Sequence, residues 1–379
     1  MKKKMIAAGH ICIDITPVIN SEKIENITDI LAPGGLVHVK EADIHTGGSV
    51  ANTGLAMKIL GGDVSLMGKV GKDEFGRMIL NILEKYDAGS GMIVEEDAST
   101  SYSVVLAIPG IDRIFLHNSG ANDTFSVSDL NMELIKEAQL FHFGYPPLME
   151  NLYKEDGKRL AELFETVKKT GVITSMDMAA VTEQSQAGLA DWNIILEKTL
   201  PYVDFIFPSF EEICFMLDKE KYHMLLKRAA GKDITTILSI QEDVVPLAEV
   251  LLAMGVKFVV IKCGAAGFYY KAADKELFAK LQEHTDIDFS SFAGKEGFEK
   301  SYVPDDVISA TGAGDTMIAA FLTAMIQGYS LERCLQLAAA TGASCVATVD
   351  ALSGLQTFDA LIKKIDAGWQ KQNLVDYCC

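Results

Sequence analysis

The most informative stretch of the sequence reads Val307-Ile308-Ser309-Ala310-Thr311-Gly312-Ala313-Gly314-Asp315-Thr316. Apolar residues follow it at helical spacing, which predicts a helix that begins near Gly312. Small residues here let backbone N–H groups converge at the helix start, where unpaired donors and the helix dipole favour an anion. Asp315 would lie in the first turn, where its carboxylate can accept a proton from an attacking hydroxyl. Taken alone, the pattern favours a glycine loop with an aspartate cap.

A second glycine-led helix start reads Gly47-Gly48-Ser49-Val50-Ala51-Asn52-Thr53-Gly54-Leu55-Ala56. The paired glycines permit a hinge or the close approach of a ligand. Asn52 would lie about one turn into the helix, with its amide available to a polar ligand. The alternative is a plain turn followed by a core helix. The glycine-rich residues downstream have neither the spacing of a Walker A loop nor a dinucleotide fingerprint after a strand.

Short apolar, β-branched runs alternate with longer amphipathic segments along the chain. Strands are expected over residues 5–13, 172–176, 205–207 and 257–262. Helices are expected over residues 50–60, 74–86, 153–170, 243–254, 316–327 and 331–349. Continuous apolar strands separated by helices are typical of βαβ crossovers. The sequence therefore predicts an α/β fold: one domain over residues 1–379, a three-layer α/β/α sandwich with a mostly parallel central sheet.

Two parts of the chain depart from this alternation. Residues 36–46, and 102–108 with 113–117, are predicted strands, the second pair joined by a turn at 109–112. They indicate a small β-sheet lid, within about 15–47 and 100–120, that can close over a site. Residues 279–304 are rich in glycine, serine and charge, so we expect a long surface loop or insertion, to which we assign no function.

Composition and charge exclude several classes of protein. The 379 residues are 49% hydrophobic and 23% charged, so the chain can bury a large core and is not intrinsically disordered. A net charge of −18 argues against a general nucleic-acid binder. The seven cysteines form no C-x-x-C pair or zinc-like cluster, which favours a reducing compartment. No apolar run reaches the ~20 residues of a spanning helix, so a cytoplasmic protein without a membrane partner is expected. The terminal Cys378 and Cys379 have no assigned role.

Polar residues follow three of the expected strands. Asp14 comes after the first strand, where ligand-facing residues of α/β sheets usually lie. Ser209 and Glu212 come after another, with Glu212 in the first turn of a helix, where it can hold a hydrated Mg²⁺. The stretch from Lys262 to Gly267 follows a third strand and can cradle a nucleotide. For each cluster alone, a turn or a helix cap is the better interpretation.

Taken in order, these segments resemble the ribokinase-like (PfkB) carbohydrate kinase family over nearly the whole chain. Residues 47–76 resemble its N-terminal signature, and residues 306–325 resemble its C-terminal signature with the G-A-G-D core. The resemblance implies transfer of the γ-phosphoryl group of ATP to a hydroxyl of a small sugar, with Mg²⁺. It also implies a homodimer that forms through the lid.

The resemblance further implies a role for each cluster. Asp315 would be the general base, while the N–H groups of Ala313 and Gly314, in a turn shaped by Gly312, would stabilise the transferred phosphoryl group. The residues that would bind the sugar are Asp14, Gly47, Gly48 and Asn52. The residues on the nucleotide side would be Ser209, Lys262, Gly264 and Gly267, with Glu212 acting on Mg²⁺.

Departures from the family pattern keep alternatives open. The family's N-x-x-E asparagine is Ser209 here, and the acidic residue common before T-G-A-G-D is Ser309, which disfavours a K⁺ site. Both changes motivate a non-catalytic sugar- or nucleotide-sensing relative, although the presence of Asp315 argues against it. A nucleoside kinase of adenosine type is the alternative within the family, and aromatic side chains could line its pocket: Tyr102, Phe143 and Tyr145. A phosphosugar kinase is less favoured, because Lys40 and Arg113 are the only obvious cations near the lid. Residues 177–181 do not match the D-x-N-x-R pattern of keto-deoxy-sugar kinases.

Overall fold

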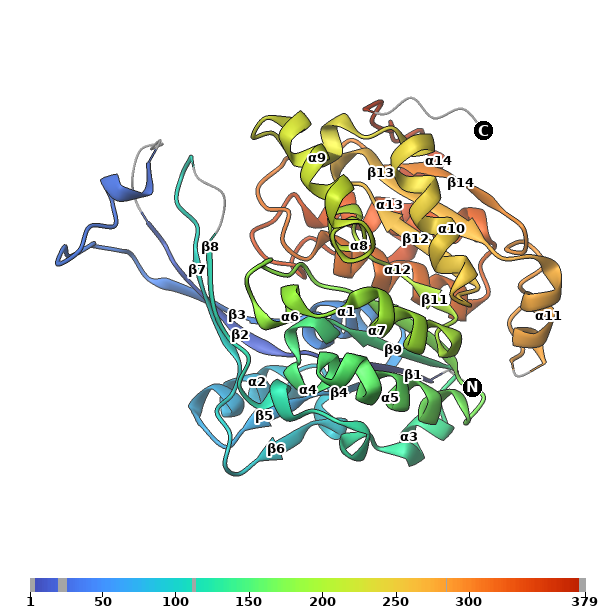
Figure 1. Cartoon of the computed structure of the whole chain (residues 1–379), viewed down its shortest axis with the longest axis horizontal. Helices are drawn as coiled ribbons and strands as arrows, with labels where there is room; N and C mark the ends of the chain where they lie inside the picture. Colours follow the sequence, from blue (N-terminus) through green and yellow to red (C-terminus); the bar gives the residue numbers. More distant parts are fainter. Residues whose placement is uncertain (1–3, 20–25, 111–113, 284, 375–379) are drawn as a thin grey trace.

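The computed structural model describes residues 4–19, 26–110, 114–283 and 285–374 (Figure 1). Within them, the largest sheet has eight strands, in the order β14-β13-β12-β11-β10-β9-β1-β4. Their bounds are β1 Lys4–Gly9, β4 Asp63–Met67, β9 Leu140–Gly144, β10 Ile173–Asp177, β11 Phe205–Ile206, β12 Phe258–Lys262, β13 Gly267–Ala272 and β14 Glu296–Lys300. The strands from β12 to β4 pair in parallel, and β13 and β14 add antiparallel pairs.

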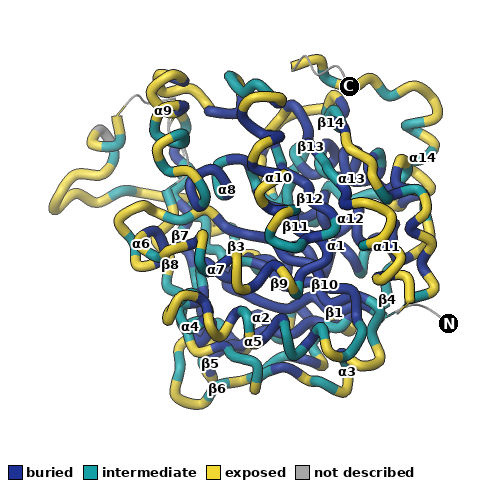
Figure 2. Tube along the Cα trace, turned by 45° about the vertical axis from the view of Figure 1, so that its right-hand side comes forward, coloured by how far each residue is buried: buried dark blue, intermediate teal, exposed yellow. Residues whose placement is uncertain are grey.

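Side chains that alternate along each strand divide the core into two layers. In β1, Met5 and Ala7 belong to one hydrophobic cluster, and Ile6 and Ala8 to the other. The helices of the first cluster include α1 Ser49–Ile59, α2 Glu74–Glu84, α11 Lys275–Gln282, α12 Ala313–Gln327, α13 Leu331–Cys345 and α14 Phe358–Asp366. Those of the second include α4 Glu150–Tyr153, α5 Lys158–Lys168, α7 Trp192–Thr199, α8 Phe210–Leu217, α9 Lys219–Ala229 and α10 Val245–Ala253. This confirms the three-layer α/β/α sandwich, and Figure 2 shows the buried trace through the sheet and α12.

A second sheet of four strands projects from the body and forms the predicted lid (Figure 1). Its order is β3-β2-β7-β8, with bounds β2 Cys12–Pro17, β3 Ala42–Gly47, β7 Tyr102–Leu106 and β8 Ile114–Asn118. β2 pairs in parallel with β7, and the two outer pairs are antiparallel. Of the turn expected at 109–112, residues 111 and 112 lie outside the described residues, as do Arg113, Cys378 and Cys379.

The prediction of a single strand over residues 5–13 is wrong. β1 ends at Gly9, and β2 begins at Cys12 in the lid sheet. Gly9 has φ +124°, and a Cβ atom there would lie 2.2 Å from the carbonyl oxygen of Gly144. The chain therefore changes sheets at a position that only glycine fits.

Two predicted helices differ in their bounds from those in the structure. The helix expected over 153–170 is interrupted, because Asp156 and Gly157 adopt left-handed conformations and α5 begins at Lys158. The helix expected over 331–349 ends at Cys345. The remaining helices are α3 Met132–Lys136 and α6 Gln186–Leu189, and the strands β5 Lys69–Gly71 and β6 Ile93–Glu95 form a separate pair. Among the described residues, no helix combines the length and apolar character that membrane crossing requires.

The prediction of a surface loop over residues 279–304 is also wrong. The segment begins inside α11 and contains β14, which adds an edge strand to the main sheet. Phe289 and Phe292 are fully buried and pack on each other, with ring centroids 5.4 Å apart. Part of the charge that suggested a loop belongs to β14, since Glu296, Glu299 and Lys300 lie on this edge strand and edge strands commonly carry charged side chains.

Candidate active site

The two glycine-led helix starts meet at the carboxyl end of the main sheet. Gly48 precedes α1 with φ +82°, and a Cβ atom there would lie 2.6 Å from the His10 carbonyl oxygen. Gly312 precedes α12 with φ +76°, and its Cβ would lie 2.2 Å from Ala351 Cβ. Both starts therefore require glycine for backbone angle and for space. The Ala313 N–H, predicted to face a phosphoryl group, donates a 3.3 Å bond to Ala310 O.

Asp315 is buried in the first turn of α12 and is surrounded by donors. Its Oδ2 accepts from Asn52 Nδ2 at 3.1 Å and its Oδ1 from Thr53 Oγ1 at 3.2 Å. The Tyr145 hydroxyl lies 2.8 Å from both carboxylate oxygens. Burial raises the pKa of Asp315, while the hydrogen bond from Tyr145 and the charge of Lys262 oppose that rise. The arrangement thus holds a desolvated carboxylate that donors keep available in its charged form.

Lys262 and Asp177 form a buried ion pair beside Asp315. Lys262 Nζ lies 2.9 Å from Asp177 Oδ1. Burial alone would lower the pKa of Lys262, but the carboxylates of Asp177 and Glu212 raise it, so the ammonium stays charged. A methyl group at Gly314 would lie 3.4 Å from Lys262 Nζ, which places the positive charge against the start of α12. Asp177 Oδ2 accepts no hydrogen bond from the described residues.

Ser209 and Glu212 form a capping box at the start of α8. Ser209 Oγ accepts from the Glu212 N–H at 3.2 Å, and Glu212 Oε2 accepts from the Ser209 N–H at 2.6 Å. The described residues contain no group of three or more His, Cys, Asp or Glu side chains that could hold a metal ion. Glu212 and the free oxygen of Asp177 fit Mg²⁺ nonetheless, because this ion commonly takes one or two carboxylates and completes its shell with phosphate oxygens and water.

Gly264 and Gly267 shape the tight turn between β12 and β13. Gly264 has φ +58°, and its Cβ would lie 2.6 Å from Thr235 Oγ1. Gly267 has φ +129°, and its Cβ would lie 2.1 Å from the Glu299 carbonyl oxygen. These backbone angles and short distances explain why glycine is needed at both positions for structural reasons alone. The turn also follows Lys262 directly, so it lies at the same edge of the sheet as the ion pair.

Asp14 lies on β2, where the lid joins the body. A Cβ atom at Gly47 would lie 2.1 Å from Asp14 Oδ2, so the carboxylate lies directly over Gly47. Burial raises the pKa of Asp14. The His10 ring lies 5.2 Å from that of His117 and 6.3 Å from that of Tyr145. Burial lowers the pKa of His10 to about 3, so this ring is neutral and links the lid junction to the surroundings of Asp315.

The sequence motifs did not predict that Thr53 and Tyr145 bond Asp315, or that Asp177 bonds Lys262 beside it. Tyr145 directly follows β9 and Asp177 ends β10, so both lie at carboxyl ends of central strands, where ligands of α/β sheets bind. Applying that rule to the expected strand at 172–176 would have found Asp177, whereas the strand before Tyr145 was not among those expected. Phe143, a candidate for pocket lining, is fully buried in the core, and the Tyr102 ring packs on Phe75 at 5.5 Å.

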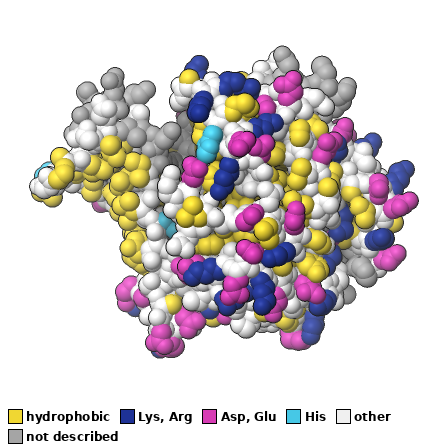
Figure 3. Space-filling view, viewed as in Figure 1, with side chains coloured by type: hydrophobic (Ala, Val, Ile, Leu, Met, Phe, Trp, Pro, Cys, Tyr) yellow, Lys and Arg dark blue, Asp and Glu magenta, His cyan; other side chains and the backbone are white. Residues whose placement is uncertain are grey.

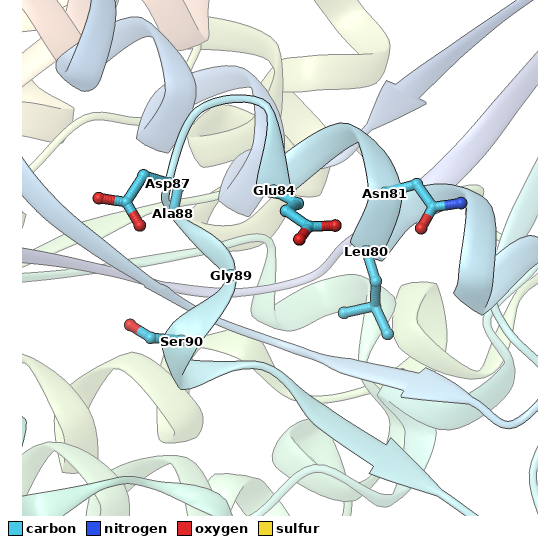
Figure 4. A pocket seen from close by; sticks show the side chains of 7 residues that line it. All are labelled: Leu80, Asn81, Glu84, Asp87, Ala88, Gly89 and Ser90. Carbon is cyan, nitrogen blue, oxygen red and sulfur yellow. The ribbon is translucent and has the colours of Figure 1, made fainter.

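A cavity of about 300 Å³ lies elsewhere, between the end of α2 and the turn that follows it (Figure 4). Its lining includes Leu80, Glu84, Gly89 and Ser90. The neighbouring Ala88 accepts a hydrogen bond from Leu66 of β4, so the cavity is at the edge of the main sheet. None of the predicted site residues lines it.

A sequence model described as "pfkB family carbohydrate kinase" matches residues 2–357. The chain belongs to the PfkB family. The family resemblance drawn from the two glycine-led segments is thus confirmed, and the protein is a carbohydrate kinase that phosphorylates a sugar hydroxyl.

Curated relatives of this PfkB-family kinase include fructokinases and sugar kinases. It is 27% identical over 376 residues to "Probable fructokinase-5" of Arabidopsis thaliana, covering 93% of this chain and 94% of that protein. It is 23% identical over 304 residues to "Uncharacterized sugar kinase" of Archaeoglobus fulgidus, covering 79% of this chain and 98% of that protein.

Solved structures share the fold of the PfkB-family kinase. Arabidopsis thaliana ribokinase complexed with ribose and ATP gives a TM-score of 0.69 at 20% identity, covering 96% of this chain and 98% of that chain. Fructokinase with bound ATP from Xylella fastidiosa gives 0.68 at 17% identity, covering 97% and 99%. At these identities the likeness concerns the fold.

Proposed function

We propose that this kinase transfers the γ-phosphoryl group of ATP to a hydroxyl of a small neutral sugar, with Asp315 as the general base. The buried Asp315 carboxylate carries the proposal, because it lies at a helix start beside the Lys262 ammonium. A base and a positively charged anion site at one place are what phosphoryl transfer to an alcohol needs. Asp14 at the lid junction would repel an anionic sugar, which favours a neutral substrate.

Each group would have a distinct task in the reaction. The sugar hydroxyl would donate its hydrogen bond to Asp315, which takes the proton as the oxygen attacks the γ-phosphorus and the bond from that phosphorus to the departing ADP breaks. Lys262 and the positive end of the α12 dipole would stabilise the negative charge on the transferred group. Mg²⁺, when bound, would neutralise charge on the β- and γ-phosphates, with Glu212 and Asp177 able to hold it. Asp14, Gly47, Gly48 and Asn52 remain the proposed sugar contacts.

ATP is the proposed phosphoryl donor. The fold neighbours named above include an Arabidopsis ribokinase and a Xylella fructokinase in complex with ATP. Just before the start of α12, Val307 and Ile308 expose 70% and 54% of their surface. The Ile308 N–H donates to Val346 O, which brings this segment next to the end of α13 near the exposed Val349. An exposed apolar surface beside the anion site suits the base of a nucleotide. Ser209, Gly264 and Gly267 would line the phosphate side.

The lid is the proposed dimer interface. Within the described residues, its sheet has β3 and β8 as edges. Apolar side chains are exposed on the lid: Leu36, Ile44, Phe115 and Leu116. Figure 3 shows hydrophobic atoms gathered on this projecting part of the molecule. An open edge and an exposed apolar face on the same small sheet favour pairing with a second copy about a two-fold axis.

D-Fructose is the first acceptor to test, since several relatives are named fructokinases. We would measure ADP formation by the purified protein with Mg²⁺, ATP and one acceptor at a time: D-fructose, D-ribose or adenosine, each with and without K⁺. A response to a sugar supports the proposal. A response to adenosine alone would favour the nucleoside kinase. Silence with every acceptor, together with a rise in melting temperature on sugar or ATP binding, would favour the sensor.

A further inference from the structure

Tyr145 is held in place by an unusual backbone. It follows β9 directly and has φ 64° and ψ 41°, a left-handed conformation that non-glycine residues rarely adopt. Pro146 and Pro147 follow it and begin a short helical turn. The Tyr145 N–H donates to Asp177 O at 3.3 Å, which ties this turn to the end of β10. The backbone thus fixes the direction of the Tyr145 Cα–Cβ bond.

The hydroxyl of Tyr145 lies against both oxygens of the Asp315 carboxylate. It lies 2.8 Å from Oδ1 and 2.8 Å from Oδ2, so it is shared equally between the two oxygens. Asn52 and Thr53 each bond one further lone pair. A carboxylate offers about four lone-pair directions, so these three donors leave at most one of them free. A substrate hydroxyl must itself come within about 2.6–3.2 Å of the base, which is the distance that the Tyr145 hydroxyl already occupies.

We propose that the Tyr145 hydroxyl stands in for the acceptor hydroxyl at Asp315 in the substrate-free enzyme, and that the sugar displaces it. The inference rests on the proposed role of Asp315 as general base. A sugar can offset the lost phenol contact through its other hydroxyls at the lid junction, whereas a single water molecule has no such contacts. Tyr145 would therefore select the sugar over water and suppress ATP hydrolysis until the acceptor is bound.

Two observations support this role. Burial and the neighbouring Asp315 raise the pKa of Tyr145 well above its usual range, so the phenol remains a donor. The Tyr145 ring also lies 6.3 Å from His10, which in turn lies beside His117 of the lid. A sugar bound at the lid junction would thus meet the Tyr145 ring on its way to Asp315.

The test is Tyr145→Phe, which keeps the ring and the left-handed backbone but removes the hydroxyl. ADP formation is measured with Mg²⁺ and ATP, first without any acceptor and then over a range of D-fructose or of the sugar found to respond. We expect acceptor-free ATP hydrolysis to rise about tenfold or more, the scale of losing one hydrogen bond to a charged group. The KM for the sugar should fall, because the sugar no longer competes with the phenol, and kcat should be retained.

Control variants separate this inference from the proposed function. Tyr153→Phe removes a phenol hydroxyl from a ring that packs on Trp192, and it should leave acceptor-free hydrolysis unchanged. In Tyr145→Phe/Asp315→Asn the extra hydrolysis should vanish. If Tyr145→Phe folds with an unchanged melting temperature but hydrolyses no more ATP without acceptor, the stand-in role is wrong, while the base remains supported by Asp315→Asn. If Asp315→Asn phosphorylates the sugar at the wild-type rate, both the base and the inference fail.

Discussion

Asn52 Nδ2 donates a 3.1 Å hydrogen bond to Asp315 Oδ2, although 263 residues separate the two in sequence. The neighbouring Thr53 donates to the other oxygen, so the start of α1 fixes both sides of the carboxylate. The helix that carries the proposed sugar contact thereby positions the proposed base. Substitutions at the start of α1 should therefore affect the phosphoryl transfer in which Asp315 of α12 is the proposed base.

Gly48→Ala tests this connection. The new Cβ would lie 2.6 Å from the His10 carbonyl oxygen, so the start of α1 must shift and take Asn52 with it. We expect a large loss of kcat and a loss of about 1–3 kcal/mol in unfolding free energy. Gly231→Ala is the matched control, because Gly231 has φ +84° but no atom within 4 Å of the added methyl group. Urea unfolding and turnover are measured for both. If the two variants lose the same unfolding free energy and the same turnover, the left-handed backbone angle causes the losses, and the close contact at Gly48 does not.

Lys262→Met should impair both stability and phosphoryl transfer. The change removes the positive charge beside the start of α12 and leaves Asp177 buried without its partner. Breaking a buried ion pair costs about 3–5 kcal/mol, whereas replacing both partners is often near neutral. Asp177→Asn/Lys262→Met should therefore regain much of the stability but none of the kcat. Recovery of turnover in the double variant would rule out a catalytic use of the Lys262 charge.

The acid limb of the pH profile of kcat/KM should reflect the protonation of Asp315. Burial raises its pKa, so kcat/KM should begin to fall at a higher pH than an ordinary aspartate near 3.9 would give. Hydrogen bonds to the charged form lower a pKa, so removing one raises it further. Thr53→Val deletes the 3.2 Å bond to Oδ1 at nearly constant shape, and the limb should move to higher pH. A limb that stays in place or moves to lower pH would argue against Asp315 as the titrating base.

A charge on the lid should dissociate the proposed dimer. Leu116 on β8 is 56% exposed, and Leu116→Asp would place a carboxylate in the apolar face of the lid. Sedimentation velocity should give a dimer for the wild type and a monomer for this variant. Leu189→Asp is the control, since Leu189 is 74% exposed on α6, outside the lid. A monomeric wild type, or a Leu116→Asp variant that still dimerises, would refute lid pairing.

Local patterns in the sequence predicted the parts of the site that lie on a single segment. The run from Gly312 to Asp315 and the run from Gly47 to Asn52 each showed a helix start, and both helices begin there. The family resemblance was confirmed over residues 2–357. The general base itself remains a proposal.

Features that depend on tertiary packing could not be predicted in this way. Residues 5–13 are apolar except for Gly9 and His10, because β1 is buried on both faces and β2 begins buried in the lid, so only this Gly-His pair marks the change of sheet. Tyr145 meets Asp315 only because β9 ends beside α12 in the folded chain. β14 resembled a loop because it is a charged edge strand.

The most direct test of the account is turnover of Asp315→Asn with the responding sugar, measured alongside its binding of ATP and of sugar. The amide keeps the size of the side chain but cannot take the proton. We predict that kcat falls by at least ~100-fold, the lower range for loss of a general base, while both dissociation constants stay close to those of the wild type. A variant that binds both ligands and phosphorylates the sugar at the wild-type rate would contradict the central claim that Asp315 is the base.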